Sequence, residues 1–65
     1  MKRVDLIRTI EQGGGVFVRH GGKHDWYRNS LTGIAQPIPR HREIREGLAK
    51  HIIKELSSPE GSSTS

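Results

Sequence analysis

Apolar residues recur with helical spacing near the start of the chain. Val4, Ile7 and Ile10 follow one another at intervals of three, and Leu6 lies four residues before Ile10. This spacing places the four side chains on one face of a helix. Gly13 is a natural residue to end such a helix, because glycine tolerates the backbone conformations that follow a last turn. The pattern therefore predicts a first helix that ends at Gly13.

A second series of apolar residues near the other end of the chain has the same character. Its members recur at intervals of four and are Ile44, Leu48, Ile52 and Leu56. Ala49 and Ile53 lie beside them on the same face. The pattern predicts an amphipathic helix interrupted only by Gly47.

The middle of the chain has the shorter period of β-strands. We predict strands at Val16–Val18, around Trp26–Tyr27, and at Ile34–Ile38, where Pro37 and Pro39 indicate an edge or fraying strand. Alternation along the second strand assigns its residues to two faces. One face carries His24, Trp26 and Arg28, and the other carries Asp25, Tyr27 and Asn29.

These elements predict an α+β domain with the order α-β-β-β-α, in which both helices cover one face of a three-stranded antiparallel meander. The domain should span residues 1–56, and residues 57–65, which contain no apolar side chain, should form a disordered Ser-rich tail. The expected core is small, so we expect marginal stability for the isolated domain. It consists of Val4, Leu6, Ile7, Ile10, Phe17, Val18, Tyr27, Ile38, Leu48, Ile52, Ile53 and Leu56.

Charge narrows the choice of partner. Eleven Lys and Arg against seven Asp and Glu give a net charge of +4 in 65 residues. A basic balance on so small a surface favours a polyanion, with nucleic acid first. The chain has no cysteine and no apolar run of membrane-spanning length, so we expect a cytoplasmic protein without a membrane partner.

The candidate chemistry lies in the stretch Gly21–Tyr27, where two glycines precede a lysine, a histidine and two aromatics. A histidine beside cations can cleave RNA without a metal, because RNA carries its own nucleophile in the 2′-hydroxyl. The same stretch is also compatible with an ordinary hairpin turn bearing a solvated histidine. His20 and His24 are spaced like metal ligands, but no third ligand completes a set, so we expect neither a metal nor another cofactor.

Three segments resemble the HicA family of toxins from HicA–HicB toxin–antitoxin pairs. They are KRVDLI at residues 2–7, GGKH at residues 21–24 with the aromatic that follows, and IPRHREI at residues 38–44, which leads into LAKHII at residues 48–53. The resemblance covers residues 1 to about 58. It implies a fold like the double-stranded RNA-binding domain, metal-independent ribonuclease activity on mRNA, and a HicB-like antitoxin as partner in a hetero-oligomer.

The family's invariant histidine after the glycine turn falls on His24, which would act as general acid or base. Gly22 would shape the turn, Lys23 would bind the scissile phosphate, and Trp26 and Arg28 would contact RNA. The chain departs from its relatives at Lys23, where they often have Ser or Asn. A second departure is Gly15, where they usually have a larger residue and where we therefore expect a loosely anchored strand.

Two other functions remain open from the sequence. A non-catalytic RNA-binding module of the same fold would bind RNA without cleaving it. A protein that binds an antitoxin but has lost its activity, through the change at Lys23, is the second.

Overall fold

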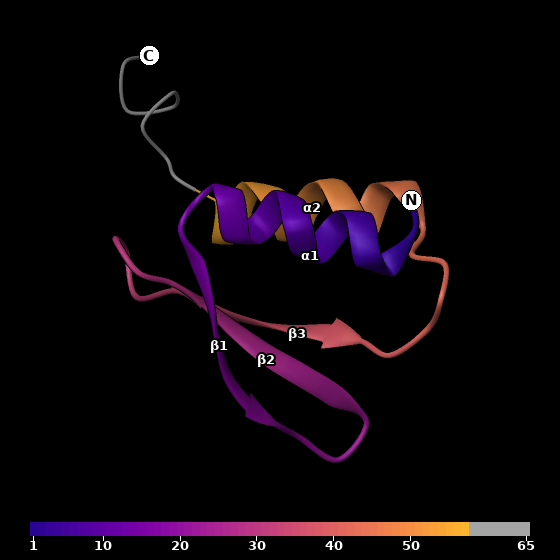
Figure 1. Ribbon diagram of the computed structural model, residues 1–65, viewed down its shortest axis with the longest axis horizontal. Coiled ribbons are helices and arrows are strands. Elements are labelled where there is room, and N and C mark those ends of the chain that lie inside the picture. The colour runs from indigo at the N-terminus through magenta and orange to yellow at the C-terminus, as the bar shows by residue number, and fades with distance from the viewer. Residues whose placement is uncertain (58–65) are drawn as a thin grey trace.

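The computed structural model of the protein describes residues 1–57 and has five elements in the predicted order. They are α1 (Arg3–Gln12), β1 (Gly15–His20), β2 (His24–Asn29), β3 (Ala35–Pro39) and α2 (Glu46–Leu56). Both helices lie on the same side of the sheet (Figure 1), which confirms the α-β-β-β-α arrangement of the double-stranded RNA-binding domain. Apart from Ser57, the tail that was predicted to be disordered lies outside the described residues.

The three strands form an antiparallel meander in the order β1-β2-β3. The central strand β2 pairs with β1 through Tyr27 and Phe17, and with β3 through Tyr27 and Gln36. The predicted edge position of β3 is confirmed. Pro37 and Pro39 are compatible with it because an edge strand needs ladder donors on one side only.

The core lies between the helices and the covered face of the sheet. Tyr27 reaches it from β2 and is 7% exposed, as predicted, and burial raises the pKa of its hydroxyl. The buried apolar residues come from both helices, from β2 and β3, and from the segment before α2. They are Leu6, Ile10, Tyr27, Ile38, Ile44, Ala49, Ile52 and Leu56, with Met1, Ile7 and Ile53 packed against them.

Four residues that we expected in the core are exposed instead. Val4 and Leu48 lie on outward sides of the helices, at 59% and 41% exposure. The helix α2 begins at Glu46, so Ile44 precedes it and fills the core from the connecting segment. Phe17 and Val18 are 46% and 47% exposed because the β1–β2 hairpin extends away from the helices (Figure 1).

The strand β1 packs closely against α1 at its first residue. Gly15 is buried, and a Cβ atom there would lie 2.1 Å from Ile10 Cγ2. Glycine therefore lets the strand approach the helix where a larger residue would need Ile10 to move. We expected this strand to be loosely anchored, but its first residue is tightly packed against α1.

The segment before α2 is tied to the start of the chain. Ile44 N donates to Met1 O at 2.7 Å, and Arg3 N donates to Arg42 O at 2.9 Å. The second bond satisfies a backbone donor in the first turn of α1, which has no side-chain cap. The residues after β3 are thereby held beside α1, a placement on which the site depends.

The side chain of Asn29 joins the end of β2 to the end of α2. Its Nδ2 donates to Ser57 O at 2.9 Å, and its Oδ1 accepts from Leu31 N at 2.8 Å. One buried amide therefore caps the helix and closes the turn of residues 29–33. Within the described part of the chain, no helix has the length and apolar character needed to cross a membrane.

Candidate nucleic-acid and catalytic site

His24 is the first residue of β2 and lies exposed near the tip of the β1–β2 hairpin. Asp25, Tyr27 and Asn29 are the buried residues of this strand, and they face the helices. The alternation predicted from the sequence is therefore confirmed. It leaves three residues on the open face of the sheet: His24, Trp26 and Arg28.

The turn before His24 depends on Gly21 more than on Gly22. Gly21 N donates to His24 O at 2.7 Å, and a Cβ atom on Gly21 would lie 2.8 Å from that same oxygen. Nothing lies within 4 Å of a Cβ atom built on Gly22, and neither glycine has a positive φ. The steric requirement for glycine therefore falls on Gly21. The following residue, Lys23, is exposed at the tip.

Trp26 lies on the open face next to a cation that no motif in the sequence indicates. Arg19 is its partner on β1, and the guanidinium carbon lies 5.4 Å from the centroid of the Trp26 ring. Pro37 is the partner on the other side. The indole is half-buried between these neighbours, so it presents an aromatic surface next to a positive charge, a combination suited to stacking a base.

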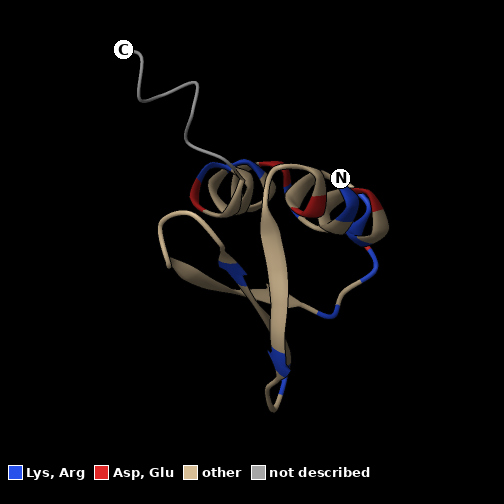
Figure 2. Cartoon of the chain, turned by 60° about the vertical axis from the view of Figure 1, so that its left-hand side comes forward, with Lys and Arg blue, Asp and Glu red and all other residues tan. Residues whose placement is uncertain are grey.

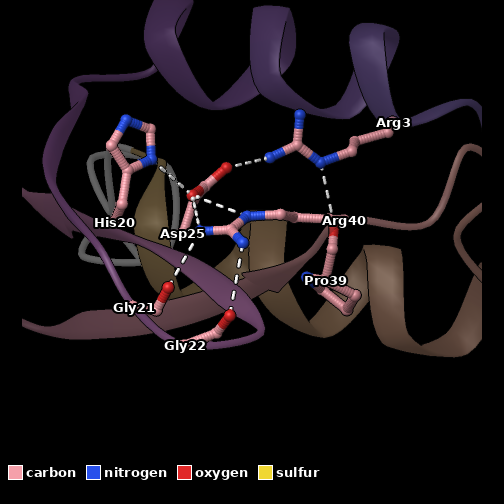
Figure 3. Close-up of polar contacts among 7 residues, drawn as sticks. All are labelled: Arg3, His20, Gly21, Gly22, Asp25, Pro39 and Arg40. Carbon is pink, nitrogen blue, oxygen red and sulfur yellow. Dashed lines mark hydrogen bonds and ion pairs between the residues drawn. The ribbon is translucent and has the colours of Figure 1, made fainter.

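On the opposite face of β2, Asp25 collects three basic side chains from three parts of the chain (Figure 3). Arg3 of α1 donates from Nη2 to Asp25 Oδ2 at 2.5 Å. His20 of β1 places Nδ1 2.8 Å from Asp25 Oδ1. Arg40, which follows β3, donates to the same Oδ1 from Nε at 3.1 Å and from Nη2 at 3.0 Å.

Arg40 also reaches the turn that precedes His24. Its Nη2 donates to Gly21 O at 2.9 Å and its Nη1 donates to Gly22 O at 3.3 Å (Figure 3). The same guanidinium therefore bridges the carboxylate of Asp25 and two carbonyls of the glycine turn. Arg3 adds a further tie by donating from Nε to Pro39 O at 2.8 Å.

A β-bulge explains how His20 reaches Asp25. The pairing of β1 with β2 shifts between Phe17 and Arg19, so that Arg19 faces Trp26 and His20 faces Asp25. Without the extra residue, the side-chain alternation would place His20 on the open face and Arg19 on the face of Asp25. The bulge therefore places Arg19 on the face of Trp26 and His20 on the face of Asp25.

The charges around Asp25 favour its ionised form. Hydrogen bonds from His20 and then from Arg40 lower the pKa of the Asp25 carboxyl from 3.8 to about 2. One carboxylate thus lies between two guanidinium groups, which leaves a surplus of positive charge. Figure 2 shows basic residues near the tip of the hairpin and along the segment between β3 and α2, and both basic and acidic residues on the helices.

The site residues predicted from the sequence lie on the open face of β2 and in the turn before it, and further residues that were not predicted surround them. His24 has no side-chain hydrogen bond among residues 1–57, and within that range no three acidic or histidine side chains cluster as a metal site would require. The residues to which the sequence assigned no role in the site are Arg3, Arg19, Asp25 and Arg40. Three of them lie in the segments KRVDLI, Gly21–Tyr27 and IPRHREI, whereas charge alone marked Arg19.

Comparison with models of protein families gives a match that covers most of the chain. Residues 4–57 match the model of a family described as the HicA toxin of bacterial toxin–antitoxin. No curated protein and no solved structure matches the chain.

Proposed function

The chain belongs to the HicA toxin family, and from this premise we propose that it is a metal-independent endoribonuclease that cleaves mRNA and thereby inhibits translation. The observation that carries the proposal is the position of His24. It is exposed at the end of a hairpin, directly after Lys23 and on the same open sheet face as Trp26 and Arg28.

This arrangement suits transfer of a phosphoryl group within RNA. His24 removes the proton from a 2′-hydroxyl, and the oxygen attacks the adjacent phosphorus while the bond from phosphorus to the 5′-oxygen breaks. The leaving 5′-oxygen takes up a proton from water, and the product keeps a cyclic phosphate. Lys23 stabilises the charge that develops on the oxygens of the scissile phosphate, and Arg28 binds a neighbouring phosphate of the same strand. DNA lacks the 2′-hydroxyl and is therefore not a substrate.

Trp26 and the turn provide the binding part of the site. The half-buried indole beside Arg19 stacks a base of single-stranded RNA, and Gly22 allows the backbone of the turn to approach the phosphate closely. Successive residues on one face of a strand are about 7 Å apart. His24, Trp26 and Arg28 can therefore follow neighbouring nucleotides along the strand.

The open face also suits an inhibitor. A HicB-like antitoxin with acidic groups would cover His24, Trp26 and Arg28 and exclude RNA from them. The exposed apolar residues of β1, Val16 and Val18, would add apolar area to such a contact. The resting form is accordingly a hetero-oligomer of toxin and antitoxin.

One observation favours a second candidate, a non-catalytic RNA-binding module. No side chain among the described residues hydrogen-bonds to the His24 ring, so no partner fixes its tautomer as catalytic histidines usually require. The Trp26–Arg19 pair would bind RNA without any proton transfer. This candidate predicts salt-dependent affinity for RNA that does not change when His24 is replaced.

Cleavage of RNA by purified protein in EDTA decides between the two. We expect the natural protein to cut single-stranded RNA and His24→Ala to lose about 10²–10⁴-fold in rate, the usual contribution of one general base. His51→Ala, which removes an exposed histidine of α2, is the matched control and should be fully active. Equal activity of His24→Ala would move the chemistry away from the turn, and activity that needs a divalent ion would end the metal-free mechanism.

A further inference from the structure

We propose that Arg40 is a positioning residue for the proposed ribonuclease, and that it acts by holding the Gly21–Gly22 turn in the conformation that presents His24. The inference rests on the proposed function of His24. It concerns a residue 16 positions further along the chain, whose hydrogen bonds go to Asp25, Gly21 and Gly22 and not to the His24 ring.

The first support is the number of hydrogen bonds that converge on one guanidinium. An arginine has five N–H donors. Four of them are directed at protein acceptors, two at Asp25 Oδ1 and one each at Gly21 O and Gly22 O. A group whose donors are used in this way holds backbone in place and has little capacity left to bind a phosphate.

The second support is that the orientation of Arg40 is itself fixed. Asp25 is 8% exposed, and its other oxygen, Oδ2, is taken by Arg3. His20 occupies a further position around Oδ1. The carboxylate therefore cannot turn away from Arg40 without breaking contacts to α1 and β1. The guanidinium is thereby held beside the carbonyls of Gly21 and Gly22.

The third support is the character of the turn. Two successive glycines have more conformational freedom than any other pair of residues, and they immediately precede Lys23 and His24. Among the described residues, the only side chain that hydrogen-bonds to the carbonyls of Gly21 and Gly22 is that of Arg40. The backbone bond from Gly21 N to His24 O then passes the restraint on to the catalytic residue.

The chemistry requires arginine at this position. Lysine carries the same charge, but its single ammonium cannot present a planar fork to a carboxylate and to two carbonyls at once. Arg40→Lys therefore keeps the local charge while removing the geometry. A fixed turn matters for rate because a displacement of about 1 Å in a catalytic group can cost on the order of 10²-fold.

The test compares Arg40→Lys with Arg42→Lys in RNA cleavage under single-turnover and steady-state conditions. Arg42 is an exposed residue of the same segment, and its side chain has no hydrogen bond or ion pair within residues 1–57. We expect Arg40→Lys to lower kcat by about 10–100-fold with little change in KM. Arg42→Lys should match the natural protein.

Amide hydrogen exchange provides a readout that does not depend on activity. Gly21 N should exchange about tenfold faster in Arg40→Lys, whereas the amides of α2 should be unchanged. A second variant, Arg40→Met, keeps the aliphatic stem and should show the same two effects. Thermal melts identify a purely structural role: if both Arg40 variants are unfolded at the assay temperature, the positioning role is overturned.

The outcomes separate this inference from the proposed function. If His24→Ala is inactive and Arg40→Lys has the natural kcat, the inference fails and the ribonuclease proposal stands. A rise in KM at constant kcat would instead make Arg40 an RNA-binding residue and would overturn the positioning role. If the natural protein cleaves no RNA, the proposed function fails and the positioning role of Arg40 in catalysis fails with it, whatever the exchange rates show.

Discussion

His20 Nδ1 and Asp25 Oδ1 lie 2.8 Å apart across the β1–β2 hairpin. The contact exists because the bulge in β1 turns His20 to the face of the sheet where Asp25 also meets Arg3 and Arg40. These partners bind the carboxylate better than the protonated acid. The ionisation of Asp25 therefore makes the stability of the folded protein depend on pH.

We predict that Asp25 supports stability only above acidic pH. Its pKa is about 2 in the folded protein against 3.8 for the free group, so folding favours the ionised form. Its contribution to the free energy of unfolding is complete above the unfolded pKa and is lost as pH falls from about 4 to about 2. Asp25→Asn should be less stable than the natural protein at pH 6 and should lose less stability on acidification.

Urea unfolding at a series of pH values between 2 and 6 measures this difference. The control is Asp5→Asn, which removes an exposed carboxylate of α1 whose nearest basic atom, Arg8 Nη1, is 3.4 Å away. The natural protein and Asp25→Asn should converge at the acid end. If the free energies of unfolding of the natural protein and of Asp25→Asn changed in parallel with pH over the whole range, Asp25 would contribute packing or neutral hydrogen bonds and not charge.

The sequence predicted the fold well because the fold depends on local patterns. Apolar spacing indicated both helices, and alternation in β2 correctly separated His24 and Trp26 from the buried Tyr27. The errors arose where burial depends on how far an element extends beyond its neighbours. Phe17 lies on a hairpin that projects past the helices, and Leu48 is exposed on α2 whereas Ile44, which precedes the helix, is buried.

The contacts around the turn were predicted only in part for the same reason. His24 follows a recognisable glycine turn, so a local motif was enough to propose it as a site residue. Asp25 meets Arg3 from 22 residues away and Arg40 from 15 residues away, and no periodicity relates such positions. The bulge that brings His20 to Asp25 has no signature in the strand, because Val16–Val18 fits an unbroken strand equally well.

The two glycines of the turn should respond differently to alanine. In Gly21→Ala, the new Cβ would lie 2.8 Å from His24 O and 3.0 Å from Trp26 Nε1, so the turn must shift. We expect a loss of about 1–3 kcal/mol in the free energy of unfolding, the usual cost of overpacking, together with reduced cleavage. Denaturant unfolding and a cleavage assay measure the two effects.

Gly22→Ala is the matched control, because no atom lies within 4 Å of its added methyl group. It should keep its stability within about 0.5 kcal/mol. A large loss of cleavage in Gly22→Ala at unchanged stability would show that RNA approaches the backbone there. Equal tolerance of both substitutions would contradict the crowding seen at Gly21.

Asn29 should be among the most sensitive polar residues of the domain. Asn29→Asp keeps the oxygen that accepts from Leu31 N, but it replaces the donor to Ser57 O with a negative oxygen near the carbonyl end of α2. Asn29→Ala removes both functions. We expect each variant to lose about 1–3 kcal/mol of stability. Asn29→Asp should be less stable than Asn29→Ala at neutral pH. Its stability should approach that of Asn29→Ala at low pH, where the new carboxyl is protonated. Thermal melts of both variants at pH 3 and pH 7 measure this difference.

The antitoxin should stabilise the toxin as well as inhibit it. The buried core is smaller than the sequence suggested, since Val4, Phe17, Val18 and Leu48 are exposed, and the net charge of +4 repels itself in the folded state. A partner that binds only the folded form adds about 4 kcal/mol at a thousandfold excess over Kd. If it is acidic and covers His24, Trp26 and Arg28, the same contact excludes RNA and offsets the repulsion. Thermal melts of the toxin with and without the antitoxin should then differ by several degrees, with the gap narrowing at high salt. An isolated toxin that melts as high as the complex would refute the stabilising role, and cleavage of RNA by the intact complex would refute the placement of the partner over His24.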